Sequence, residues 1–172
     1  MGFLEPDGRY RRCDGQASLS RDVGRLLGIA RHARPRGPIE TIERADVSVA
    51  EGLHGDFRGS LKPGRNKRQV TVMAAESWRD ALHDLGTQVS WEQRRVNLLV
   101  EGLALEEATG ARLVFESGLV LEVTGECDPC SRMEDVAPGL KAALLPYWRG
   151  GVITRVIESG PIRVDEQVRI ER

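Results

Sequence analysis

Two cysteines, Cys127 and Cys130, stand three positions apart in the segment 125–133. A cysteine binds a metal or carries sulfur as its thiolate, and a neighbouring cation or the start of a helix favours that form. Arg132 lies two positions after Cys130, and a helix-capable segment follows. The alternative is an inert pair, because unpaired cysteines are often small, buried, apolar residues. The spacing makes Cys130 the first candidate for chemistry.

Two common uses of a Cys-x-x-Cys pair have little support elsewhere in the chain. A structural zinc site needs further ligands at regular spacing, and the remaining candidates are scattered: Cys13, His32, His54 and His83. A thioredoxin-like redox pair belongs where a strand meets a helix in a βαβ pattern. The pattern of this chain is mostly that of strands, so neither use is favoured.

Groups suited to binding an anion occur in two other segments. Arg94, Arg95 and Asn97 precede an apolar strand, and their guanidinium and amide groups can hold a phosphate and the polar edge of a heterocycle. The basic loop 62–68 contains Gly64, and backbone amides freed by glycine can cradle an anion. This loop lacks the Gly-Lys-Ser/Thr of a nucleotide-binding phosphate loop. Each segment alone is more typical of a solvated, charged surface than of a binding site.

Length and composition favour one globular domain. The chain has 172 residues, of which 40% are hydrophobic and 30% charged, and its net charge of −1 argues against bulk binding to nucleic acid or to an anionic membrane. Three cysteines make no disulfide framework and indicate a reducing compartment. The first 22 residues do not resemble a signal peptide, and no apolar run approaches the roughly 18 residues of a membrane helix. We therefore expect a cytoplasmic protein.

Hydrophobic patterns predict many short strands and few helices. Strands are predicted at 23–30, 39–49, 69–74, 96–100, 152–157 and 168–170, with 111–115 and 119–124 forming a hairpin. Helices are predicted at 75–85, where Gly86 stops the pattern, and at 138–147. Residues 1–22 are predicted to form a loose extension, and 23–172 a single domain. The fold class is mostly β with a few short helices, either a barrel or a sandwich.

Six segments taken in order resemble a known family, the MOSC domain, named for the C-terminal domain of molybdenum cofactor sulfurase. They are Gly52–Asp56, Lys67–Val70, Arg94–Leu98, Gly125–Met133, Gly150–Val152 and Gly160–Asp165. The resemblance runs from about Val23 to Ile170. It implies a MOSC-type β-barrel and a site for the molybdenum cofactor, molybdopterin.

The resemblance also implies roles for particular residues. Cys130 matches the cysteine that either ligates molybdenum or carries sulfur as a persulfide, a natural role for a soft thiolate. The run His54-Gly55-Asp56 matches a family loop, and we expect it to shape that loop. Arg132 is proposed on electrostatic grounds alone. The predicted cofactor-binding residues are Arg95, Asn97, Thr124, Arg132, Lys67 and Arg68.

Two functions follow from this resemblance. The first is an oxidoreductase with Cys130 as molybdenum ligand, which reduces N-hydroxylated small molecules with electrons from a partner protein. A partner is needed because the chain has no Gly-x-Gly-x-x-Gly fingerprint and is too short for a further cofactor domain. The alternative is a sulfur carrier that receives a persulfide on Cys130 from a cysteine desulfurase. Cys127 departs from both mechanisms; we favour a packing role for it over that of a resolving thiol. A barrel with an inert cysteine pair is the non-catalytic alternative.

Overall fold

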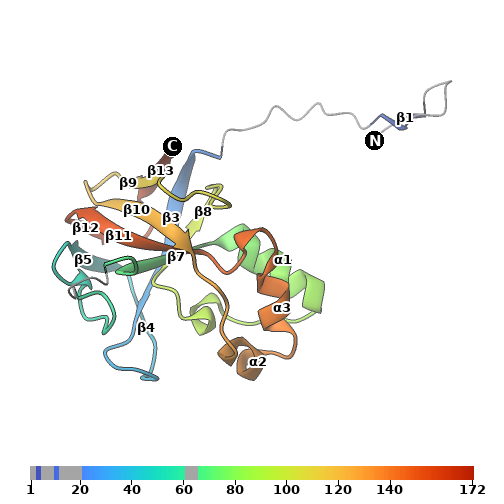
Figure 1. The fold of residues 1–172 in the computed structure, drawn as a ribbon, viewed down its shortest axis with the longest axis horizontal. Helices are drawn as coiled ribbons and strands as arrows, with labels where there is room; N and C mark the ends of the chain where they lie inside the picture. Colours follow the sequence, from blue (N-terminus) through green and yellow to red (C-terminus); the bar gives the residue numbers. More distant parts are fainter. Residues whose placement is uncertain (1–2, 5–9, 12–20, 61–65) are drawn as a thin grey trace.

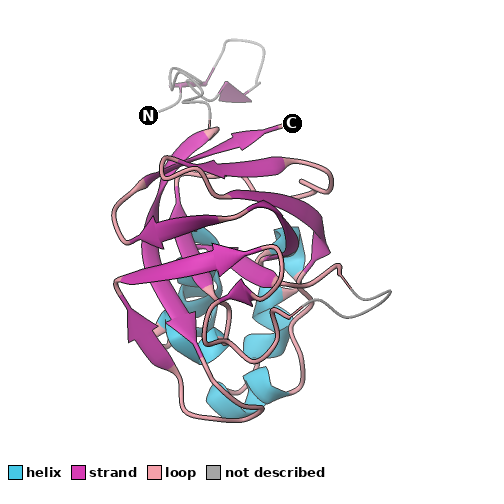
Figure 2. Ribbon diagram, turned by 90° about the vertical axis from the view of Figure 1, so that its left-hand side faces the viewer, coloured by secondary structure: helices cyan, strands magenta, loops and turns pink. Residues whose placement is uncertain are grey.

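The computed structural model describes residues 3–4, 10–11, 21–60 and 66–172, and seven of its strands close into a barrel. The barrel closes because β13 pairs with both β9 and β3, and Figures 1 and 2 show its strands wrapping around one core. In barrel order the strands are β13 (Gln167–Glu171), β9 (Arg112–Phe115), β10 (Val120–Glu126), β11 (Val152–Glu158), β7 (Val70–Ala74), β8 (Leu98–Glu101) and β3 (Val23–Arg31). The predicted mostly β fold with few short helices is confirmed.

One pair of strands determines where the helices lie. Strands β7 and β8 are parallel, whereas the other neighbours in the barrel are antiparallel. Parallel neighbours need a long crossover, which here contains α1 (Ala75–Leu85) and the 3₁₀ helix η1 (Trp91–Arg94). Helix α1 has the predicted bounds and ends at Gly86, whose left-handed φ of 62° favours glycine.

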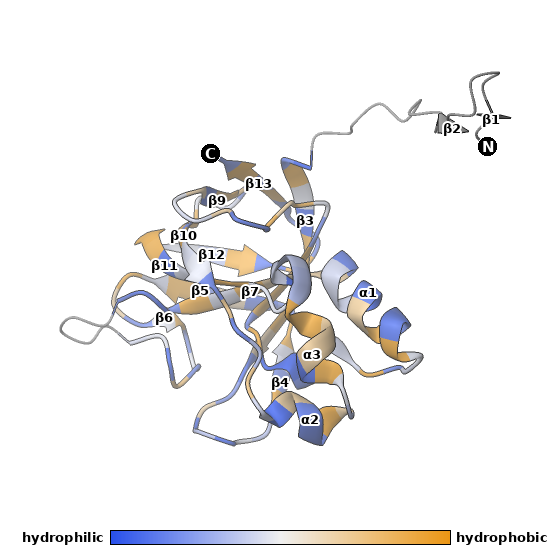
Figure 3. Cartoon of the chain, turned by 45° about the vertical axis from the view of Figure 1, so that its right-hand side comes forward, coloured by the Kyte–Doolittle hydropathy of each residue, from blue (hydrophilic) through white to orange (hydrophobic). Residues whose placement is uncertain are grey.

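The helices cover one side of the barrel and form a second core there. Helix α3 (Leu140–Leu144) lies beside α1, and α2 (Arg132–Val136) precedes it (Figure 1). Both α1 and α2 carry alternating hydrophobic and hydrophilic residues (Figure 3). All five residues of β7 are buried, because Val72 packs inside the barrel while Met73 packs under the helices. The predicted helix 138–147 is shorter than expected: the 3₁₀ helix η2 (Pro146–Trp148) follows it, and Tyr147 has a left-handed φ of 55°.

A small sheet beside the barrel corrects one prediction and contains one strand that was not predicted. The predicted strand 39–49 is wrong as one strand: β4 (Glu40–Ile42) pairs with β3, and β5 (Arg44–Ser48) pairs with β12 (Gly160–Arg163). One straight strand cannot follow both partners, so the chain breaks at Glu43. Strand β12 was not predicted, because glycine followed by proline is typical of a turn. Proline fits there because β12 is the edge of the order β12-β5-β6, where β6 is Gly52–Leu53.

Most of the predicted extension 1–22 lies outside the described residues, as do residue 61 and residues 62–65 of the basic loop. Strands β1 (Phe3–Leu4) and β2 (Tyr10–Arg11) pair with each other. The domain boundary after residue 22 stays a prediction. In the described part of the chain, no helix is long and apolar enough to cross a membrane.

Candidate functional site

A buried histidine–aspartate pair joins the end of β3 to the loop after β6. The Oδ1 atom of Asp56 lies 3.2 Å from the Nδ1 atom of His32 and accepts a hydrogen bond of 3.1 Å from the His32 backbone N–H. The Oδ2 atom of Asp56 accepts another, of 3.2 Å, from the backbone N–H of Arg58. The ring of Phe57 packs edge-on against His32, with 4.8 Å between ring centroids. Asp56 therefore shapes its loop, as expected.

Arginine charges act on this pair: those of Arg58, Arg95 and Arg132 act on His32, and that of Arg68 acts on Arg58. We call these four residues the arginine cluster. Burial lowers the pKa of the Arg58 guanidinium, and the charges of the other three arginines lower it further, while Asp56 opposes them. Burial and then Arg132 lower the pKa of Arg95 in the same way. Guanidinium groups stay protonated in proteins, so the cluster concentrates positive charge at one place.

The cluster has little local compensation for this charge. Within the described ranges, Asp56 is the one carboxylate that opposes the pKa changes of Arg58 and Arg95, and no ion pair involves any of the four guanidinium groups. The Arg58 guanidinium instead lies over the ring of Phe57, 5.0 Å from its centroid. Such a site is suited to an anionic ligand.

The same charges act on His32. Burial lowers the pKa of its imidazole, Asp56 raises it, and Arg95, Arg58 and Arg132 lower it again, with a net direction below the ordinary value. Because the ordinary pKa of histidine is about 6.5, the ring is mostly neutral at neutral pH.

The backbone of Arg95 separates it from its neighbour Arg94. Arg95 follows η1 with a left-handed φ of 64°, a conformation that costs a side-chain-bearing residue about 1–3 kcal/mol. Its Nη2 atom donates a hydrogen bond of 3.1 Å to the carbonyl oxygen of Gly37. Arg95 thereby reaches the cluster and the loop after β3, whereas Arg94 points into the protein.

Arg94 is buried and holds two distant segments together. Its Nη2 atom donates hydrogen bonds of 2.8 Å to the carbonyl oxygens of Cys127 and Gly150, and it lies 3.5 Å from the Sγ atom of Cys127. The backbone N–H of Cys127 donates a hydrogen bond of 2.8 Å to Gly151. A Cβ atom at Gly150 would come within 2.6 Å of the Cys127 carbonyl oxygen, so this close approach requires glycine. Of the two predicted anion-binding arginines, only Arg95 belongs to the cluster.

The two cysteines differ in accessibility. Cys127 is 2% exposed, in keeping with the favoured packing role, whereas the free thiol of Cys130 is exposed. The carbonyl oxygen of Cys130 accepts a hydrogen bond of 3.0 Å from the N–H of Met133, in the first turn of α2. Arg132, two residues after Cys130, brings this segment to the arginine cluster.

Asn97 lies in the core rather than on an open surface. Its Oδ1 atom accepts hydrogen bonds of 3.0 Å from both the backbone N–H and the hydroxyl of Thr71, and its Nδ2 atom donates one of 3.3 Å to the carbonyl oxygen of Ala30. Asn97 thus joins β7 to β3, close to His32. Its contact with a cofactor stays a prediction.

Lys67 and Thr124 meet each other at a different place. The hydroxyl of Thr124 donates to the carbonyl oxygen of Lys67, and both residues line a hollow of about 430 Å³ with Glu122 and Arg155. None of the four clustered arginines lines this hollow. Of the predicted cofactor-binding residues, Arg68, Arg95 and Arg132 act on the same guanidinium group, that of Arg58, whereas Lys67 and Thr124 line this hollow.

Sequence reasoning missed two members of the site, His32 and Arg58. His32 stands 24 positions before its partner Asp56, so no local spacing pointed to it. Arg58 follows Asp56 by two positions, and Asp56 directly follows Gly55. This run of glycine, carboxylate and cation could have indicated Arg58 as a site residue. The carboxylate of Asp56 and the guanidinium of Arg58, both in the loop after β6, could therefore have been proposed as site residues from the sequence.

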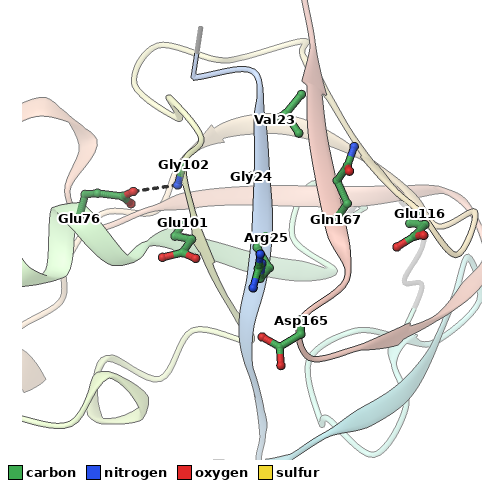
Figure 4. A pocket seen from close by; sticks show the side chains of 9 residues that line it. All are labelled: Val23, Gly24, Arg25, Glu76, Glu101, Gly102, Glu116, Asp165 and Gln167. Atoms are coloured by element: carbon green, nitrogen blue, oxygen red, sulfur yellow. Dashed lines mark hydrogen bonds between the residues drawn. The ribbon is translucent and has the colours of Figure 1, made fainter. Parts of the chain in front are cut away.

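A second hollow, of about 590 Å³, is mainly acidic, in contrast to the arginine cluster (Figure 4). Four carboxylates, those of Glu76, Glu101, Glu116 and Asp165, and one cation, Arg25, line it. The Oε1 atom of Glu76 accepts a hydrogen bond of 2.7 Å from the backbone N–H of Gly102. An acidic lining disfavours an anionic cofactor, so the arginine cluster is the better candidate site.

Comparisons with known proteins identify the fold and the family. The chain is similar to the solved structure of the YUAD protein from Bacillus subtilis, with a TM-score of 0.70 and 19% identity over 86% of this chain and 95% of that one. It is also similar to YiiM from Escherichia coli, with a TM-score of 0.63 and 14% identity over 86% of this chain and 70% of that one. YiiM from Geobacillus stearothermophilus has a TM-score of 0.60 and 14% identity over 87% and 73% of the two chains. No curated protein sequence matches significantly.

The family assignment comes from the sequence itself. The model of the MOSC domain matches residues 62–169, which is more than half of the chain and includes Arg68, Arg95, Cys130 and Arg132. The resemblance inferred from six short segments is confirmed, and so is the expected MOSC-type barrel. The chain belongs to the MOSC domain family.

Proposed function

We propose that this protein binds the molybdenum cofactor, with Cys130 as the protein ligand of molybdenum and the arginine cluster at the cofactor's phosphate. The observation that carries this proposal is the convergence of four guanidinium groups beside the segment with the exposed Cys130 thiol. The known association of the MOSC family with this cofactor supports it.

The residues at the site fit the chemistry of such a cofactor. A planar guanidinium donates two parallel hydrogen bonds to phosphate oxygens, and the cluster provides positive charge that few neighbouring carboxylates offset. The exposed thiol of Cys130 is free of a disulfide, and soft thiolates are suitable ligands for soft metals. Arg132, beside the cysteine segment, favours the anionic form of any group bound there.

The proposed reaction is the reduction of an N-hydroxylated small molecule. The cofactor, when bound, supplies two-electron transfer to the N–O bond. The balance is R₂N–OH + 2e⁻ + 2H⁺ → R₂NH + H₂O, in which the N–O bond breaks and its oxygen leaves as water. The two electrons come from a separate electron-donor protein of the flavin or iron–sulfur class. The chain's own residues bind the cofactor, orient it through Cys130 and the arginines, and hold protons.

The test is the metal and pterin content of the protein purified from a host that makes the molybdenum cofactor. We expect about one molybdenum and one pterin per chain, and we expect the Cys130→Ser variant to lose the metal. Because the Cys130 side chain is exposed, its replacement should not disturb folding, which circular dichroism checks. Protein that contains neither molybdenum nor pterin, although the host makes both, would refute the proposal.

The exposure of Cys130 also favours a second candidate, sulfur transfer. A thiol that receives sulfur must be reachable by the active-site cysteine of a desulfurase, and Cys130 is accessible whereas Cys127 is not. Mass spectrometry of protein treated with a cysteine desulfurase and cysteine tests this function. A mass increase of one sulfur atom on Cys130, in protein that takes up no molybdenum, would favour the sulfur carrier.

A further inference from the structure

The His32–Asp56 pair has no role in the proposal above, yet its geometry defines where a proton can bind. Nδ1 of His32 lies 3.2 Å from Oδ1 of Asp56. Because an ionised carboxylate only accepts hydrogen bonds, Nδ1 carries the hydrogen. The other ring nitrogen, Nε2, has no hydrogen-bond partner among the described residues. Nε2 is therefore the atom that gains or loses a proton.

Charged groups from three segments act on the ring, and Phe57 joins His32 to Arg58, since its ring centroid lies 4.8 Å from that of His32 and 5.0 Å from the Arg58 guanidinium carbon. The charged groups are Asp56 and Arg58 from the loop after β6, Arg95 after η1, and Arg132 in α2. The three arginines repel a proton on His32, and Asp56 attracts it. An oxyanion among these arginines would offset their repulsion, because its negative charge acts on the same ring.

We propose that His32 is a proton-binding group coupled to the arginine cluster, which takes up a proton when a tetrahedral oxyanion binds there and releases it when the oxyanion leaves. The oxyanion is a phosphate group, either that of the bound cofactor or free inorganic phosphate. This inference rests on the proposed function, since the same arginines would hold the cofactor's phosphate. The protein would then hold one of the two protons consumed by the reduction only when its cofactor is present.

Thermodynamic linkage makes this proposal quantitative. If the oxyanion raises the pKa of His32, protonation of His32 must raise the affinity for the oxyanion by the same free energy. Each unit of increase in that pKa therefore corresponds to about tenfold tighter oxyanion binding below the titration range than above it. Two independent measurements must then agree.

The probe for both measurements is sodium sulfate, because sulfate has the shape of phosphate and keeps its charge over the neutral pH range. When the protein is prepared without an affinity tag, its three histidines give the only imidazole signals. NMR follows the ring signals against pH in chloride and in sulfate at equal ionic strength, and the His32→Gln variant assigns His32. Isothermal titration calorimetry measures the sulfate affinity of both proteins over the same pH range.

The expected result is a titration midpoint of His32 that rises in sulfate, while the signals of His54 and His83 serve as references. The sulfate affinity of the unmodified protein should rise as the pH falls, and that of His32→Gln should not change with pH. In chloride, Arg95→Gln should raise the His32 midpoint, because one repelling charge is gone.

Two outcomes overturn the inference. Sulfate that binds without moving the His32 midpoint would show that the cluster and the histidine are not coupled, and it would leave the cofactor proposal intact. Absence of sulfate binding would also overturn the inference, because the coupling requires an oxyanion at the arginines. The molybdenum content of the purified protein is independent of both outcomes, so the failure of either proposal is recognisable.

Discussion

Arg94 with Cys127 and Arg95 with Cys130 are the same two residue types in opposite surroundings. Arg94 and Cys127 are buried and contact each other, with the guanidinium bound to backbone carbonyls. Arg95 reaches the arginine cluster, and Cys130 is exposed. One pair holds the loop in place, and the other is available to a ligand. The same residue type therefore has a structural role at one position and is available for binding at another, and the backbone position decides which.

Replacement of the buried arginine should have the largest effect on stability. In Arg94→Met the carbonyl oxygens of Cys127 and Gly150 lose their charged donor, so we expect the free energy of unfolding to fall by about 3 kcal/mol. Arg95→Met is the matched control and should lose less than about 1 kcal/mol. Urea unfolding measures both. Equal stabilities of the two variants would contradict the structural role given to Arg94 and not to Arg95.

The close approach of Gly150 to Cys127 offers a second test of the same loop. A Cβ atom in Gly150→Ala would meet the Cys127 carbonyl oxygen at 2.6 Å, so we expect a loss of about 2 kcal/mol in stability. Gly125→Ala is the control, because its Cβ atom would meet only Ile153, at 3.9 Å. Thermal unfolding compares the two. A Gly150→Ala protein as stable as the control would mean that the loop is not held as described.

The half-buried Arg95 should show its effect in binding. We expect Arg95→Gln to weaken sulfate binding about tenfold, since a guanidinium contributes charged hydrogen bonds to an oxyanion. Arg112→Gln removes an exposed arginine of β9 outside the cluster and should leave the affinity unchanged. Calorimetry at one salt concentration provides the comparison. Equal affinities of the two variants would remove Arg95 from the site.

The smallest effect concerns pH. Because burial and the arginines lower the pKa of His32, the unfolded chain binds more protons than the folded one just below the ordinary pKa of about 6.5. The free energy of unfolding should therefore decrease as the pH falls from about 6.5 towards the folded pKa of His32. His32→Gln should lack this part of the decrease, and His83→Gln, on the exposed end of α1, should keep it. Urea unfolding at several pH values decides this, and identical slopes in the two variants would contradict the assignment.

The fold was predictable from the sequence wherever a local pattern determines structure. The period of apolar residues gave α1 its bounds, and alternation gave the hairpin of β9 and β10. The division of residues 39–49 between two sheets was not predictable, because it depends on the partners β3 and β12, which lie far away in the chain.

The candidate site was predictable in part, for the same physical reason. Family resemblance and charge pointed to Cys130, Arg95 and Arg132. Nothing local distinguishes Arg94 from Arg95, since their separation depends on the left-handed backbone of Arg95. The role of His32 depends on contacts with residues 24 or more positions away.

We propose that Cys130, and not Cys127, holds the cofactor's metal. The most direct measurement is the molybdenum-to-protein ratio of Cys130→Ser and Cys127→Ser, purified side by side from a host that makes the cofactor. We expect Cys130→Ser to contain no molybdenum, while Cys127→Ser retains a ratio close to that of the unmodified protein. Molybdenum retained in Cys130→Ser, or lost equally from both variants although both are folded, would contradict it.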